Sequence, residues 1–171
     1  MPAGRSLLKM SPTPGGAVLV TSFVCVATLA FSQMQSLDAK DTFAAAHLSS
    51  QEADEVIHAV SDCAFDIPDS WETELRARPV DLGAARGLLL QGTNRLCGGT
   101  GNCQIFVLRK VNQRWTSLFG NEQAPIGEGY LFGPKTTNGI KDLTSIANDS
   151  FNHSSRVKYR FDGVVYTPVK P

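Results

Sequence analysis

The spacing of apolar residues changes once along this chain, from a helical repeat to a strand-like one. Between residues 48 and 64 the apolar side chains recur at the three- and four-residue intervals of an amphipathic helix. They are Leu48, Ala53, Val56, Ile57, Val60 and Ala64. Ser49 and Glu52 have the spacing of a capping box at its start, and Pro68 follows its end. The pattern predicts one helix of about four turns.

From Glu74 onward, short β-rich runs alternate with turn residues. The predicted strands are 75–78 with 80–82, 87–91, 104–108, 114–119, 130–132, 142–146, 157–161 and 164–166. Pro79 lacks a backbone donor, which confines the first of them to a sheet edge or a bulge. Because no helical pattern separates the runs, we predict an α+β domain. In it the N-terminal amphipathic helix is followed by an antiparallel β-meander of six to eight strands, open or rolled.

Residues 1–32 have the pattern of a signal peptide. Arg5 and Lys9 precede an apolar run over 17–31, and Ala30 and Ser32 are small residues at positions that a signal peptidase reads. The apolar run is shorter than the roughly 20 residues of a membrane-spanning helix. We therefore expect cleavage after Ser32, no stable membrane span afterwards, and a periplasmic or secreted protein.

The rest of the chain is predicted to form a loose, alanine-rich arm over 33–47 and a single domain over 48–171. Loss of residues 1–32 leaves 14 basic and 16 acidic side chains. Such a near-neutral domain is unsuited to nucleic acid, which is bound through clustered Lys and Arg side chains. Arg156, Lys158 and Arg160 share one face of a strand, and we interpret them as a solvated basic ridge.

Two cysteines, Cys97 and Cys103, bracket a glycine-rich segment between two predicted strands. A disulfide between them would close a short loop, whose residues are Gly98, Gly99, Thr100, Gly101 and Asn102. Cys63 lies on the apolar face of the predicted helix and is expected to be a buried, reduced thiol. A metal site is the less favoured alternative, because the cysteine spacing exceeds that of a zinc knuckle and no histidine is near. No Gly-Lys-Ser/Thr segment follows the glycines, so we expect no nucleotide or other cofactor.

Three motifs in this order resemble a family of uncharacterised exported bacterial proteins. They are C-G-G-T-G-N-C at 97–103, N-G-I-K-D-L at 138–143 and Y-R-F-D-G at 159–163. The resemblance covers roughly residues 74–168. It implies an exported β-rich domain and no particular activity.

Candidate catalytic groups are scattered along the chain. The histidines are His47, His58 and His153, and no nucleophile motif accompanies any of them. His58 falls on the solvent face of the predicted helix. His153 falls in the polar segment 148–155, which we interpret as a mobile connection.

A small secreted hydrolase is the alternative function, and its carboxylates, such as Asp142, Asp162 and Glu128, would meet only in the fold. The sequence favours instead an exported, non-catalytic binding or envelope accessory protein, for example an inhibitor. Residues 98–102 are its candidate binding loop, because recognition usually involves loops carried on a rigid scaffold. The expected partner is another exported protein or an envelope component.

The signal-peptide pattern predicts that the mature protein begins near Gln33. Intact-mass measurement of the protein recovered from its native cells should show that residues 1–32 are missing. A soluble cytoplasmic protein that retains them would contradict this expectation.

Overall fold

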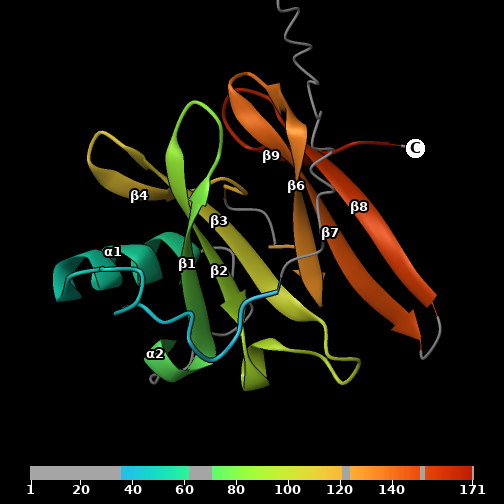
Figure 1. Ribbon diagram of the computed structural model, residues 1–171, viewed down its shortest axis with the longest axis horizontal. Helices are drawn as coiled ribbons and strands as arrows, with labels where there is room; N and C mark the ends of the chain where they lie inside the picture. The colour runs from blue at the N-terminus through green and yellow to red at the C-terminus, as the bar shows by residue number, and fades with distance from the viewer. Residues whose placement is uncertain (1–35, 62–70, 121–123, 151–152, 171) are drawn as a thin grey trace, which may run out of the picture. The chain divides into compact units, whose positions relative to one another are not determined.

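The computed structural model of the chain describes residues 36–61, 71–120, 124–150 and 153–170 (Figure 1). The predicted signal segment and Cys63 lie outside the described residues. The elements are α1 (Ser50–Ser61), α2 (Trp71–Glu74), β1 (Leu75–Asp81), β2 (Arg86–Gly92), the 3-10 helix η1 (Asn94–Leu96), β3 (Cys103–Val111), β4 (Arg114–Ser117), β5 (Ile126–Gly127), β6 (Gly129–Thr137), β7 (Ile140–Ser150), β8 (His153–Phe161) and β9 (Tyr166–Pro168).

The start of α1 confirms the predicted capping box. The Ser49 backbone N–H donates to Glu52 Oε2 at 3.1 Å, and the Glu52 N–H donates to Ser49 Oγ at 3.3 Å. Lys110 on β3 donates to the other carboxylate oxygen of Glu52 at 2.6 Å, and this bond is the main reason that the pKa of Glu52 falls to about 2. Helix α1 is described as far as Ser61, and the residues in which it was predicted to end lie outside the described part.

The strands form two antiparallel sheets, with the orders β1-β2-β3-β4 and β6-β7-β8-β9. The short β5 pairs with the beginning of β3. The β-rich, antiparallel character is therefore as predicted, and β1, which contains Pro79, is an edge strand. The prediction of one meander of six to eight strands is wrong, because the described residues form nine strands that are divided between two sheets.

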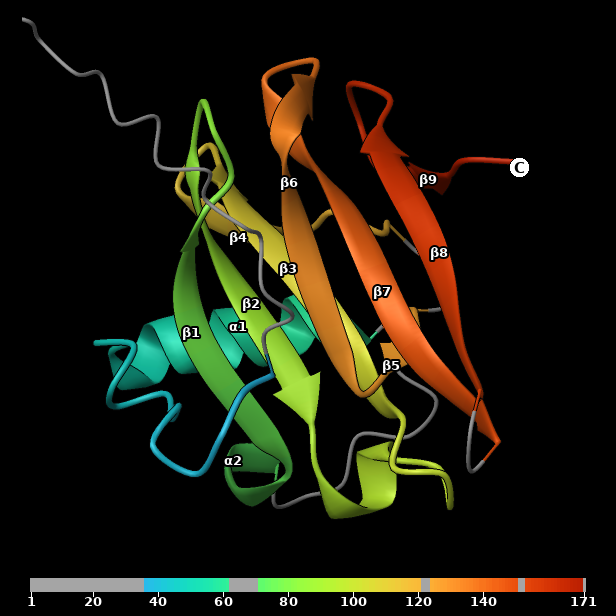
Figure 2. The same ribbon diagram turned by 45° about the vertical axis from the view of Figure 1, so that its right-hand side comes forward.

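Burial on both faces of β2 explains the second sheet. Its segment 87–92 is entirely buried, and Leu88 and Leu89 point to opposite faces of the first sheet. Leu88 belongs to a core that the first sheet shares with Val56 and Val60 of α1. Leu89 belongs to a second core, which the first sheet shares with residues of the second sheet such as Leu143. A strand that is apolar on both faces needs a covering layer on each side, and α1 and the second sheet supply those layers (Figures 1 and 2).

The hairpin β6–β7 turns at Asn138 and Gly139, which have φ values of 49° and 80°. Positive φ at both central residues is the requirement of a tight hairpin turn, and an Asn-Gly pair satisfies it with little strain. The strands that follow are longer than predicted, since β7 reaches Ser150 and β8 begins at His153. The interpretation of 148–155 as a mobile connection is thus wrong for the residues described there.

The predicted loose arm is described from residue 36 and is anchored on β1. The Ala77 N–H donates to the Asp41 backbone carbonyl at 3.0 Å, and Arg78 Nε donates to Asp41 Oδ1 at 2.9 Å. Phe43 and Ala46 are buried in the core beside α1. The bond from Arg78 is the main cause that lowers the pKa of Asp41. Residues 36–47 are therefore part of the folded domain and not a loose arm.

Candidate functional site

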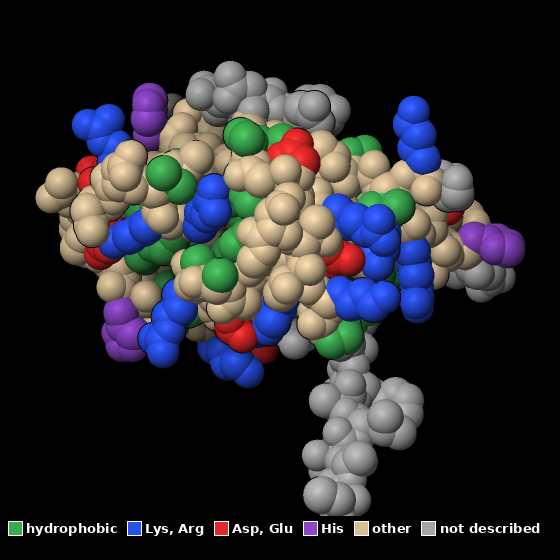
Figure 3. Space-filling model, turned by 90° about the horizontal axis from the view of Figure 1, so that it is seen from above, with side chains coloured by type: hydrophobic (Ala, Val, Ile, Leu, Met, Phe, Trp, Pro, Cys, Tyr) green, Lys and Arg blue, Asp and Glu red, His purple; other side chains and the backbone are tan. Residues whose placement is uncertain are grey.

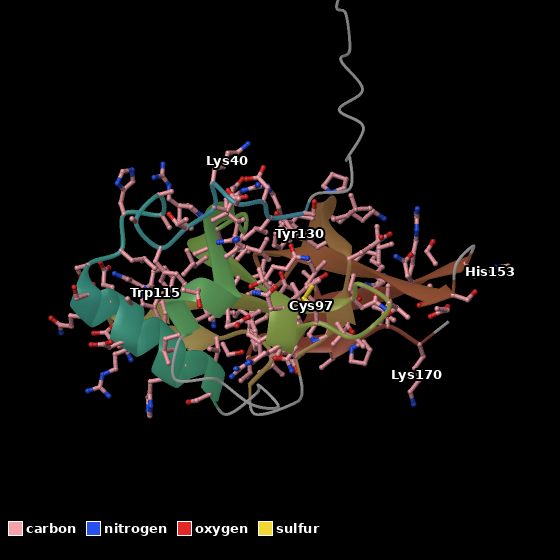
Figure 4. The ribbon with its side chains drawn as sticks, turned by 90° about the horizontal axis from the view of Figure 1, so that it is seen from below. Lys40, Cys97, Trp115, Tyr130, His153 and Lys170 are labelled. Atoms are coloured by element: carbon pink, nitrogen blue, oxygen red, sulfur yellow. A yellow bond between two sulfur atoms is a disulfide. The ribbon has the colours of Figure 1, made fainter. Side chains whose placement is uncertain are left out.

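The predicted disulfide between Cys97 and Cys103 is present and closes the loop between η1 and β3 (Figure 4). Two backbone bonds order the loop inside it. The Gly98 N–H donates to the Asn102 carbonyl at 2.7 Å, and the Gly101 N–H donates to the Gly98 carbonyl at 3.0 Å. Gly101 has a φ of 81°, a conformation that glycine adopts without strain. The loop is thus closed covalently and also folded into a turn.

The five predicted loop residues divide into two kinds. Gly98, Gly99, Thr100 and Gly101 are exposed, whereas Asn102 is 6% exposed. Asn102 is buried because its side-chain amide forms hydrogen bonds inside the protein. The predicted binding loop is therefore an exposed stretch of four residues with a buried fifth residue that fixes its position.

Asn102 joins the loop to the end of β7. Its Oδ1 accepts from the Asn148 backbone N–H at 2.7 Å, and its Nδ2 donates to the Asn148 carbonyl at 2.8 Å. The same Nδ2 donates to Thr100 Oγ1 at 2.8 Å. The Asn148 side chain in turn donates to Glu128 Oε2 at 2.7 Å. A side-chain amide thus pairs with both backbone groups of one residue, as a neighbouring strand would.

Close approach of β5 to β7 completes this junction. Gly127 pairs with Cys103, and the Glu128 N–H donates to the Ile146 carbonyl at 2.8 Å. A Cβ on Gly127 would lie 2.6 Å from that same carbonyl oxygen, so a larger residue would push the strands apart. Glycine at this position lets the chain pass from the first sheet to the second beside the loop.

Two hollows meet at the junction and share Asn148. The first, which we call the loop cleft, is lined by Gly99, Thr100, Asn148 and Ser150. The second, which we call the β8 groove, has a volume of about 620 Å³. The β8 groove is lined by Asn102, Ala124, Pro125, Ile126, Ser145, Ala147, Asn148, Asp149, Ser155, Val157 and Tyr159. Its lining combines polar residues with the apolar side chains of Ala124, Pro125, Ile126 and Val157.

The carboxylates of the alternative hydrolase hypothesis each have separate partners. Asp162 Oδ1 accepts from the backbone N–H groups of Val165 and Val164, which lower its pKa and fix the β8–β9 turn. Glu128 accepts from Asn148, as described above. Neither lines the loop cleft or the β8 groove as far as the described residues define them.

Asp142 is 4% exposed and lies beside the basic ridge. Burial acts to raise the pKa of Asp142, but Thr137 Oγ1, which donates at 2.8 Å, and the Lys158 ammonium at 3.1 Å outweigh it and lower the pKa. Arg160 Nε is 3.8 Å from the same carboxylate. Asp142 is therefore an ionised partner of the ridge and lacks the raised pKa of a general acid.

The histidines His47, His58 and His153 are exposed, and Figure 4 shows His153 at the far end of β8, pointing away from the protein. In the described part of the chain, no group of three or more His, Cys, Asp or Glu side chains is placed to hold a metal ion. No helix among the described residues is long and apolar enough to cross a membrane.

Asn102 was a predicted site residue, but its partner Asn148 and the other residues that line the β8 groove were not. Asn148 and Asp149 were part of the segment interpreted as mobile, and Tyr159 was only one residue of a predicted strand. The Asn138-Gly139 pair is the signal that could have located them. An Asn-Gly pair favours a tight hairpin turn, and such a turn predicts that β7 continues antiparallel to β6 as a long strand.

No protein-family model, no curated protein and no solved structure shows a significant match to this chain. Its candidate site is therefore defined by the geometry of the loop, the junction and the two hollows.

Replacement of Asn102 by alanine should lower the free energy of unfolding by about 1–3 kcal/mol, since it leaves both backbone groups of Asn148 without these partners. Urea denaturation measures this change. Thr100→Ala is the control, because it removes one of the three bonds and should cost about 0.5–1 kcal/mol. Equal small losses in both variants would contradict the role given to Asn102.

Proposed function

We propose that this protein is an exported, non-catalytic binding module, and that it recognises its partner with the disulfide loop and the hollows beside it. The proposal rests on one observation, which is that two separate restraints hold the loop in place. The Cys97–Cys103 bond closes it, and Asn102 ties it to β7. Glycine-rich loops lose more backbone freedom on binding than other segments do, so a loop ordered in advance loses less affinity.

The proposed compartment is the periplasm or the exterior of the cell. A disulfide supports this, since such bonds persist in oxidising compartments and are rare in reducing ones. The proposed partner is another exported protein or a component of the cell envelope. Residues 98–101 would present mainly backbone groups to it, because three of the four are glycines.

The carboxylates favour binding over hydrolysis as the proposed function. General acid–base chemistry needs two groups that converge on one substrate position. Asp142, Glu128 and Asp162 instead each complete a separate local contact.

Gly99→Arg tests the loop cleft with little risk to the fold. A Cβ at Gly99 would meet no atom within 4 Å, so the arginine projects from the loop without strain. Immobilised wild-type protein should capture a partner from the envelope fraction of its native cells, and Gly99→Arg should lose most of it. Mass spectrometry of the eluted material measures the capture.

Val164→Arg is the matched control, since Val164 is 74% exposed in the β8–β9 turn and lies outside both hollows. It should capture the partner as the wild type does. Equal capture by all three proteins, or equal loss in both variants, would refute the loop cleft as the binding surface.

A further inference from the structure

The outer edge of β8 is paired over only part of its length. β8 extends from His153 to Phe161, but β9 pairs with Tyr159–Phe161, and the Val169 N–H adds one bond to the Lys158 carbonyl. Figure 2 shows β9 beside the upper end of β8. Within the described chain, residues 154–157 pair with β7 on one side and with no strand on the other.

Strand geometry identifies which backbone groups face this open edge. The Lys158 carbonyl points toward β9, and the N–H and C=O groups of a strand point to alternate sides at successive residues. Arg156 and Ser154 have the same orientation as Lys158. Their N–H and C=O groups therefore point outward, where an additional strand would find its hydrogen-bond partners.

The two faces beside the open edge differ in chemistry. On one side lies the β8 groove, where Val157 is 38% exposed and Ile126 is 49% exposed. They are two of the four large apolar side chains exposed in the described chain. On the other side lies the basic ridge of Arg156, Lys158 and Arg160, which Asp142 neutralises only in part. Figure 3 shows Lys and Arg side chains gathered at the right of the molecule, the β8 end.

We propose that the open edge of β8 binds an extended peptide segment of the partner in which apolar and acidic residues alternate. The segment would add as a strand opposite Ser154–Val157. Its apolar side chains would enter the β8 groove, and its carboxylates would lie along the basic ridge. Asp149 in the groove reinforces this orientation, because it repels an acidic side chain that points inward. The inference rests on the proposed function, since it names the chemistry of the partner.

Charge argues against a second copy of this chain as the occupant. If two β8 edges paired antiparallel about Arg156 or Val157, cationic side chains of the two copies would lie directly opposite each other. Like charges in that position destabilise a strand pair. The ridge has the same effect on any basic strand, which favours acidic segments over basic ones.

The test uses a fluorescein-labelled peptide of eight residues in which valine and glutamate alternate, with fluorescence anisotropy as the measurement. The wild-type protein should bind it. A peptide with lysine in place of glutamate should not bind.

A third peptide keeps all the side chains but carries N-methyl groups on the valine amides, and a fourth carries them on the glutamate amides. In an extended peptide the valine amides lie on one edge of the strand and the glutamate amides on the other. Only one of these peptide edges can pair with β8, so one of the two methylated peptides should lose binding.

Two variants locate the site on the protein. Arg156→Glu should weaken binding about fivefold, since it replaces a favourable cross-strand charge pair with a repulsive one. Arg114→Glu, an exposed arginine on the edge strand β4 of the other sheet, is the control and should bind as the wild type does. Amide NMR signals of Ser154 and Arg156 should shift on binding and exchange more slowly.

No binding of the valine–glutamate peptide by the folded wild type would overturn the inference. So would undiminished binding of both methylated peptides, which would indicate charge attraction without strand addition. Neither result bears on Gly99→Arg, so loss of partner capture in that variant would leave the proposed function standing while the β8 edge is rejected.

Discussion

The pairing of the Asn102 side chain with the backbone of Asn148 is the contact on which the candidate site depends. It attaches a loop of the first sheet to the end of a strand in the second sheet. The disulfide alone would close the loop but leave it free to move as a unit. With the amide bonds added, the exposed glycines are held at one position relative to β7, and the two hollows keep their walls.

The layered architecture explains why binding would use the second sheet. β2 in the first sheet is buried on both faces between α1 and the second sheet, so it offers no surface to a partner. The second sheet is covered on one face, and its strand β8 extends beyond the short β9. Available backbone groups and exposed apolar side chains therefore occur together at β8. Basic residues on its other face prevent unspecific pairing there, as natural edge strands often require.

Local patterns predicted much of the fold. Most strands, the capping box of Ser49 and Glu52, and the Cys97–Cys103 bond depend on residues near each other in sequence, and all were predicted. The division into two sheets was not, because Leu88 and Leu89 look alike in sequence although they enter different cores. Asn102 and Asn148 are 46 positions apart, and no pattern in either segment predicts their contact. The exposed loop residues could be proposed from the sequence, but the junction that holds them could be identified only in the structure.

Amide hydrogen exchange of the free protein, followed residue by residue by NMR, tests most directly whether a fixed loop lies beside an open strand edge. The N–H groups of Gly98 and Asn148 are donated to Asn102 and should exchange slowly, since exchange requires the junction to open. The N–H groups of Ser154 and Arg156 point away from β7 and should exchange rapidly. Rapid exchange at Gly98 and Asn148, or protection at Ser154 and Arg156, would contradict the account.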